Sequence, residues 1–202
     1  MIDIAVLVTA FALIFIAELP DKSAIAGLVL GTRFPWLWVF IGIATAFLVH
    51  VLVALAAGQL LTLLPERAVE TVVAVLFLVG AVLIWREGMA DEEETEDTER
   101  AAVAGVPDNA GFWKVASLGF GVIFVAEWGD LTQIMTANLA AKYDDPLSVG
   151  IGATLGLWAV GLLAILFGKT LLRVLPMRWI TRIAAVVLVG LGIWSSYRVI
   201  TG

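Results

Sequence analysis

The sequence contains no cysteine and only one histidine, His50. These absences exclude disulfide bonds, thiolate metal sites and a zinc site built from several histidines. Charged residues are scarce as well, because Asp, Glu, Lys and Arg together make up 15% of the 202 residues. Nine of the 18 acidic residues fall between Glu87 and Asp108, so the net charge of −6 reflects that stretch and not the rest of the chain.

Hydrophobic residues are abundant, at 61% of the sequence, and long apolar runs recur along its whole length. A soluble domain needs more polar surface than this composition provides, whereas an apolar helix of about 20 residues crosses a hydrocarbon core of about 30 Å. The sequence therefore predicts an all-α polytopic membrane protein. Six transmembrane helices are expected at about Ile4–Leu30, Trp36–Leu63, Val69–Trp85, Phe112–Ala140, Leu147–Leu175 and Ile180–Val199.

The chain contains an internal duplication. The segment Phe15–Ser23 matches Phe124–Thr132 at an offset of 109 residues, and Ala44-Thr45 matches Ala153-Thr154 at the same offset. Biased composition does not explain these matches, since the charged residues match as well as the apolar ones. We infer a first repeat over residues 1–86, an acidic linker over 87–111 and a second repeat over 112–202.

Each repeat holds three predicted spans, and this odd number has a topological consequence. The second repeat must enter the membrane from the side opposite to the first, so the two are expected to be inverted about a pseudo-two-fold axis in the membrane plane. Inverted repeats are common in secondary transporters, where the binding site lies near the midplane between the repeats.

Lys and Arg residues are distributed unequally between the two sides of the predicted membrane domain. Eight fall in or near the loops of one side and three on the other, which assigns the first side to the cytoplasm. Both termini are then expected outside, and the linker inside. The first apolar run has neither the basic segment nor the cleavage site of a removable targeting peptide, so the expected location is a prokaryotic plasma membrane.

Two acidic motifs, Glu18–Ser23 and Glu127–Thr132, lie at equivalent positions within long apolar spans. An ionisable group at such depth costs several kcal/mol unless it faces a partner, water or an ion. On a helix, residues i and i+3 share a face, so the Glu and Asp of each motif are expected to point the same way. Inverted repeats would bring the two pairs together. The predicted metal-binding residues are Glu18, Asp21, Ser23, Glu127, Asp130, Thr132 and Gln133.

Ligands of this kind are all oxygen atoms, which suits a hard divalent cation such as Ca²⁺, Mn²⁺ or Mg²⁺. Without a cation the clustered carboxylates would repel one another and take up protons, which a cation would then displace. Pro20 and Gly129 should break the helices at the motifs and expose carbonyl oxygens. The expected partners are the transported ion and the lipid bilayer, with no further cofactor, no nucleic acid and no enzymatic activity. The oligomeric state is left open.

Three other interpretations of the motifs were weighed. A salt-bridged packing element is disfavoured because Lys22 neutralises one carboxylate and not four, and Leu131 supplies no second cation. An intramembrane aspartyl protease would also need two buried aspartates, but Trp128 stands two residues before Asp130 and the Gly-x-Gly-Asp pattern expected of such a protease is absent. A passive divalent-cation channel is the main alternative, because acidic rings select cations. It would move the metal without moving protons in the opposite direction.

Two other features are given modest roles. His50 lies mid-span and is interpreted as a packing residue more than a proton relay, because its repeat counterpart is Ala159. The acidic run at residues 91–99 lacks the Asp-x-Asp-x-Asp-Gly pattern of an EF-hand. It is therefore interpreted as a solvated tether and not as a calcium sensor.

The sequence resembles the Golgi-type calcium/manganese transporter family, in which each hydrophobic half carries Glu-x-Gly-Asp-(Lys/Arg)-(Ser/Thr) and an acidic cytoplasmic loop joins the halves. The resemblance covers essentially the whole chain. It implies a cation/proton exchanger that moves Mn²⁺ or Ca²⁺ out of the cytosol, and its short bacterial members favour Mn²⁺. Pro20 replaces the first motif glycine, and Leu131 replaces the second basic residue. By motif position the family's acidic residues correspond to Glu18, Asp21, Glu127 and Asp130, and its hydroxyls to Ser23 and Thr132.

Overall fold

The computed structural model describes residues 2–19, 23–61 and 106–174, with scattered positions between 71 and 82 and between 186 and 197. The elements in the three continuous stretches are all helices. They are α1 (Ile4–Glu18), α2 (Ser23–Arg33), α3 (Trp36–Leu61), α6 (Phe112–Ala126), α7 (Leu131–Tyr143) and α8 (Pro146–Val174).

The predicted first span is two helices and not one. Asp3 caps the N-terminus of α1, where its side chain accepts hydrogen bonds from the backbone N–H groups of Ala5 and Val6. This helix ends at Glu18, and α2 begins at Ser23. Pro20 stands between them in the sequence and cannot donate a helical hydrogen bond, which accounts for the interruption.

The predicted fourth span is likewise two helices. The axes of α6 and α7 differ by 75°, and the chain turns between Ala126 and Leu131. Gly129 adopts a φ of +78° in this turn, a left-handed conformation that glycine enters without steric cost. Asp130 is extended and caps α7, with its carboxylate accepting from the N–H of Thr132.

Among the described residues, two helices are unbroken and long enough to cross a bilayer. They include the apolar stretches Trp36–Leu60 of α3 and Pro146–Phe167 of α8, and the bent pair of α6 and α7 makes a third crossing if it counts as one span. Six spans were predicted, but those at residues 69–85 and 180–199 lie outside the described residues except for scattered positions. The acidic run at 91–99 lies outside them entirely.

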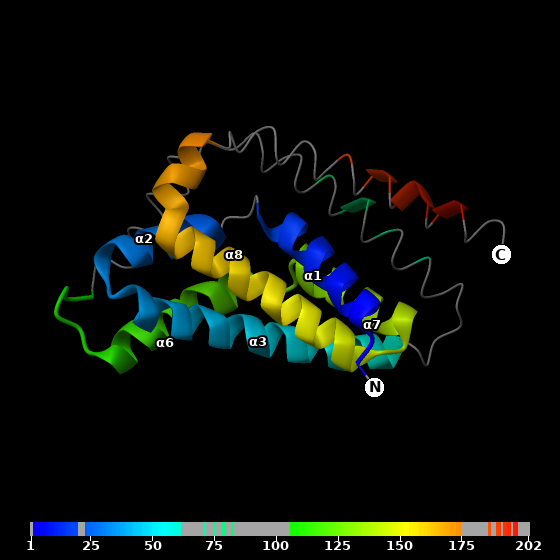
Figure 1. The fold of residues 1–202 in the computed structure, drawn as a ribbon, viewed down its shortest axis with the longest axis horizontal. Coiled ribbons are helices and arrows are strands. Elements are labelled where there is room, and N and C mark those ends of the chain that lie inside the picture. The colour runs from blue at the N-terminus through cyan, green and yellow to red at the C-terminus, as the bar shows by residue number, and fades with distance from the viewer. Residues whose placement is uncertain are drawn as a thin grey trace.

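Packing between the helices crosses from one half of the chain to the other. The broken pair α1 and α2, from the first half, lies along α8 of the second half, while α6 and α7 lie along α3 of the first half (Figure 1). The buried core between them includes Ile14, Ile43, Phe47 and Ile123. This packing of each half against the other places the ends of α1 and α6 close together in the interior.

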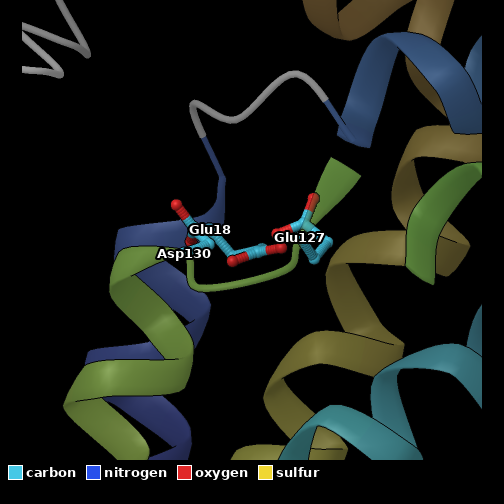
Figure 2. A group of neighbouring side chains, drawn as sticks. All are labelled: Glu18, Glu127 and Asp130. Carbon is cyan, nitrogen blue, oxygen red and sulfur yellow. The ribbon is translucent and has the colours of Figure 1, made fainter. Parts of the chain in front are cut away.

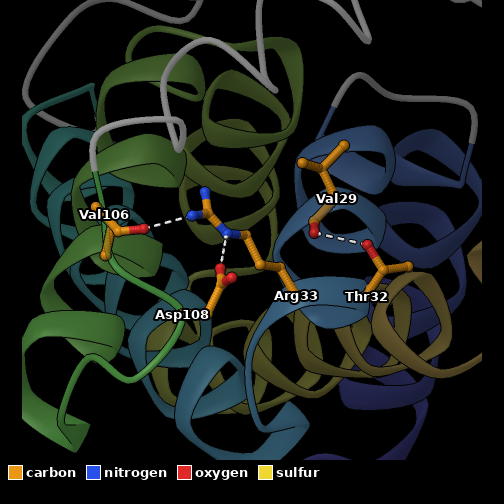
Figure 3. Close-up of polar contacts among 5 residues, drawn as sticks. All are labelled: Val29, Thr32, Arg33, Val106 and Asp108. Atoms are coloured by element: carbon orange, nitrogen blue, oxygen red, sulfur yellow. Dashed lines mark hydrogen bonds and ion pairs between the residues drawn. The ribbon is translucent and has the colours of Figure 1, made fainter.

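Arg33, at the end of α2, joins this helix to the segment that precedes α6 (Figure 3). Its Nε atom lies 2.6 Å from the Asp108 carboxylate, and its guanidinium also donates to the carbonyl oxygen of Val106. The Asp108 side chain is 81% exposed, and an ion pair in water contributes about 0–1 kcal/mol. The last residues of the predicted linker are therefore attached to the helical domain by contacts of modest strength.

Candidate cation site

The site begins with a carboxylate at the end of a helix. Glu18 is the last residue of α1, and its side chain is completely buried, at 0% exposure. A charged side chain in such surroundings is costly unless other groups or an ion offset the loss of water. Because α1 ends at Glu18, this carboxylate stands at a helix end, close to the turn between α6 and α7.

Two more carboxylates come from that turn. Glu127 follows α6 directly and is 4% exposed, while Asp130 begins α7. One oxygen atom from each of Glu18, Glu127 and Asp130 lies within 4.8 Å of the others, and Figure 2 shows the three side chains converging. Oxygen ligands lie 2.3–2.6 Å from a bound Ca²⁺ ion, so this spacing suits ligands of a single divalent cation.

The prediction that Glu127 and Asp130 share one helical face is wrong. The chain leaves the helix after Ala126 and re-enters it at Leu131, so the two residues lie on opposite sides of a turn. Their carboxylates approach because the chain bends by 75° between the two helices, with Gly129 in a left-handed conformation. The three-residue spacing is compatible with either arrangement, which is why spacing alone did not distinguish them.

The structure places the other predicted ligands as follows. Asp21 lies outside the described residues, and Ser23 begins α2 with a side chain that is not described. The hydroxyl of Thr132 donates to the Asp130 carboxylate across 3.2 Å. The carboxamide of Gln133 is held at both ends, since its Oε1 atom accepts from the N–H of Gly129 and its Nε2 atom lies 3.1 Å from Nδ1 of His50.

His50 is a site residue that the sequence interpretation treated as packing. It comes from α3, is 4% exposed, and contacts the turn through Gln133 and through the carbonyl oxygen of Phe124. A cavity of about 10 Å³ lies between His50, Glu127, Gln133 and Thr136, close to the space that one water molecule needs. The sequence did contain a signal. At the offset of 109 residues, His50 corresponds to Ala159 and Gln133 corresponds to Ala24, so neither polar residue is repeated in the other half.

These features define a class of protein: a membrane-embedded helical protein with an acidic site at broken helices. Comparison with known families agrees. The chain belongs to the GDT1 family, described as "Divalent cation/proton antiporter GDT1", whose family model matches residues 6–92 and 115–202.

Individual relatives agree with the family assignment. The chain is 34% identical to GDT1-like protein sll0615 of Synechocystis, across 81% of this chain and 84% of that protein. It is 30% identical to a Vibrio cholerae protein named "Putative manganese exporter", across 90% and 85% of the two chains. It is also 34% identical to the chloroplastic protein PAM71 of Arabidopsis thaliana, across 81% of this chain and 49% of that protein. No solved structure matches the chain.

Proposed function

We propose that this protein exports Mn²⁺ or Ca²⁺ from the cytosol in exchange for protons, through a site near the membrane midplane. The observation that carries the proposal is the meeting of Glu18, Glu127 and Asp130 at two helix breaks contributed by different halves of the chain. Asp21 would complete a set of four carboxylates, because it holds the position in the first motif that Asp130 holds in the second.

Exchange follows from the chemistry of such a site. A divalent ion that leaves water needs at least two negative charges nearby to offset its lost hydration. Without the ion, carboxylates this close together repel one another, and proton uptake relieves the repulsion. Metal and protons therefore compete for the same oxygen atoms, and each ion that binds displaces protons. A pore that conducts passively would not require this competition.

The ligand chemistry favours a hard cation. Carboxylate oxygens form the core of the site, and the hydroxyl of Thr132 supports Asp130 by a hydrogen bond. Ser23 is proposed to add a hydroxyl oxygen, whereas the Oε1 atom of Gln133 accepts from the N–H of Gly129. We favour Mn²⁺ over Ca²⁺, consistent with the name of the Vibrio cholerae relative. The oligomeric state is not assigned.

The orientation belongs to the same proposal. Six spans would place both termini on the same side, and the excess of Lys and Arg in the loops of the opposite side would assign the termini to the outside and residue 95 to the cytoplasm of a cell bounded by its plasma membrane. The crossed packing of α1 and α2 on α8, and of α6 and α7 on α3, is the arrangement that an inverted pair would give. A single cysteine introduced as Thr95→Cys should react only with a membrane-permeant thiol reagent in intact cells. Labelling by an impermeant reagent would reverse the orientation.

The transport activity is tested with purified protein in liposomes. Mn²⁺, Ca²⁺ and Mg²⁺ are supplied in turn under an imposed pH gradient, while metal uptake and internal pH are followed with separate dyes. Exchange predicts that an outward proton gradient drives metal uptake and that metal entry alkalinises the lumen. Metal flux without a matching proton flux would instead establish the channel alternative.

A further inference from the structure

We propose that His50 and Gln133 form a positioning pair that holds the turn between α6 and α7 in the shape that presents Glu127 and Asp130 to the cation. The inference rests on the proposed function, since it assigns a role within that same site. Neither side chain needs to touch the metal for this role. The pair acts across the two halves of the chain, because His50 belongs to α3 and Gln133 to α7.

The hydrogen bonds of the pair have a defined direction. A carbonyl oxygen only accepts, so the His50 Nε2 atom, 3.2 Å from the oxygen of Phe124, must carry a proton. The N–H of Gly129 donates to Oε1 of Gln133 across 2.9 Å, which fixes the orientation of the carboxamide. Its Nε2 group then donates to Nδ1 of His50, across 3.1 Å. All three bonds are satisfied together by a neutral imidazole with its proton on Nε2.

These bonds reach both sides of the turn. Phe124 lies in the last turn of α6, three residues before Glu127, while Gly129 directly precedes Asp130. His50 therefore connects the end of α6 with the start of α7. The imidazole is itself held by neighbouring rings, with centroids 5.1 Å from Phe124 and 5.8 Å from Trp128.

Helix capping alone accounts for only part of this arrangement. Asp130 and Gln133 have the spacing of a capping box, in which a glutamine at the third helical position satisfies a backbone N–H near the cap. Capping explains the bond from Gly129 to Gln133. It does not explain why the other end of the same carboxamide bonds a buried histidine from a different helix.

The duplicated sequence supplies independent support. At the offset of 109 residues, His50 corresponds to Ala159 and Gln133 corresponds to Ala24. Each repeat carries one member of the pair, and the symmetry-equivalent pair, Ala159 and Ala24, consists of two alanines. The second motif is therefore held by a side-chain hydrogen bond from the opposite half. Alanine at the two equivalent positions cannot form such a bond for the first motif. This makes the two motifs chemically unequal despite their common origin.

Loss of the pair should weaken metal binding more than turnover. Groups that orient metal ligands without touching the metal typically contribute about 10–100-fold to metal affinity. We expect His50→Leu and Gln133→Leu each to raise the apparent KM for Mn²⁺ by about 10–100-fold, with Vmax largely kept. Both variants remove the same hydrogen bond between His50 and Gln133. The apparent KM of the double variant should therefore be no higher than that of the single variant with the higher KM. His50→Asn should recover part of the affinity, since its Oδ1 atom can accept from Gln133.

The experiment measures Mn²⁺/proton exchange in liposomes for these variants, beside Thr45→Val as a control that removes a polar group on the exposed side of α3. Thermal shift titration with Mn²⁺ in detergent reports binding separately from transport. If His50→Leu does not fold, His50→Asn and Gln133→Leu carry the test. If the folded His50 and Gln133 variants keep the parent KM while Glu127→Gln is inactive, the positioning role is overturned and the proposed function stands. Effects that multiply in the double variant would also overturn the positioning role, because Gln133 would then act independently. Normal exchange by Glu127→Gln would overturn the proposed function as well.

Discussion

The backbone of Gly42 in α3 lies directly against the carbonyl group of Ala116 in α6, so close that a Cβ atom at position 42 would overlap the Ala116 oxygen. The contact fixes the distance between α3 and α6 at this point. Gly42→Ala should lower the free energy of unfolding by about 1–3 kcal/mol, because the helices must separate to admit one methyl group. Thermal unfolding in detergent measures this loss.

Gly121 in α6 provides the matched control. A Cβ atom there would have no neighbour within 4 Å, and the residue is helical, so alanine should be neutral or slightly stabilising. Equal stability of Gly42→Ala and Gly121→Ala would show that the close approach between α3 and α6 is relaxed in solution.

The three clustered carboxylates should each be required for transport. We expect Glu18→Gln, Glu127→Gln and Asp130→Asn to abolish exchange, because each removes a charge and an exchangeable proton while keeping size and an oxygen atom. Stability without metal should hold or rise as repulsion falls, and the gain in Tm on adding Mn²⁺ should shrink. Asp144→Asn, an exposed residue outside the site, should behave like the parent. Transport by any two of the three site variants would refute the shared site.

Asp130 has two separable roles, and two substitutions distinguish them. Asparagine is as good an N-cap as aspartate, so Asp130→Asn should keep the start of α7 intact while it removes the charge. Asp130→Ala should lose transport and also lower stability by about 1 kcal/mol, since the N–H of Thr132 loses its acceptor. Chemical denaturation of the two purified variants gives the comparison. Equal stability of Asp130→Asn and Asp130→Ala would mean that the N-cap of α7 contributes nothing to the stability of the fold.

The left-handed backbone at Gly129 should resist substitution although the space around it is open. A Cβ atom there would meet no neighbour within 4 Å, so any cost is conformational. Gly129→Ala should cost about 1–2 kcal/mol, and Gly129→Asn less, because asparagine tolerates this conformation better. Tm values of the two variants test this order. If alanine proved the milder substitution, the turn would not hold its positive φ in solution.

Acid should weaken the start of α8. The hydrogen bonds that Asp145 accepts from the side chain and backbone of Ser148 hold the pKa of its carboxyl below the ordinary value of 3.8. A lowered pKa stabilises the fold above the ordinary value, and this contribution is lost as the pH falls through the pKa of the folded state. The stability penalty of Ser148→Ala should therefore be constant near neutral pH and shrink below about pH 4. Unfolding curves across this range test it, and a penalty independent of pH would contradict it.

Much of the helical framework was predictable because apolar length and turn residues determine it. The predicted starts at Ile4, Trp36 and Phe112 coincide with helix starts. The presence of helix ends close in sequence to Pro20 and Gly129 followed from backbone chemistry. Their geometry did not, since a proline or a glycine marks an interruption without specifying that Asp130 caps the next helix or that the axis turns by 75°.

The surroundings of the site were harder to predict than its acids. Buried carboxylates in apolar spans stand out in a sequence because they are costly there. A histidine and a glutamine that bond each other are separated by 83 residues, and each alone has an ordinary explanation. Only the alanines at both equivalent positions, Ala159 and Ala24, mark the two residues as a pair. This pattern becomes meaningful once α3 is known to lie against α7.

The crossed packing of the helices also bears on how the protein is made. During synthesis α1 and α2 emerge long before α8, the helix they lie against, and α3 emerges long before α6 and α7. The early helices therefore enter the membrane before the helices that cover Glu18 in the complete structure have been made. Neither half made by itself should survive quality control. The two halves expressed together as separate chains should rescue each other, because most of the packing among the described helices runs between the halves.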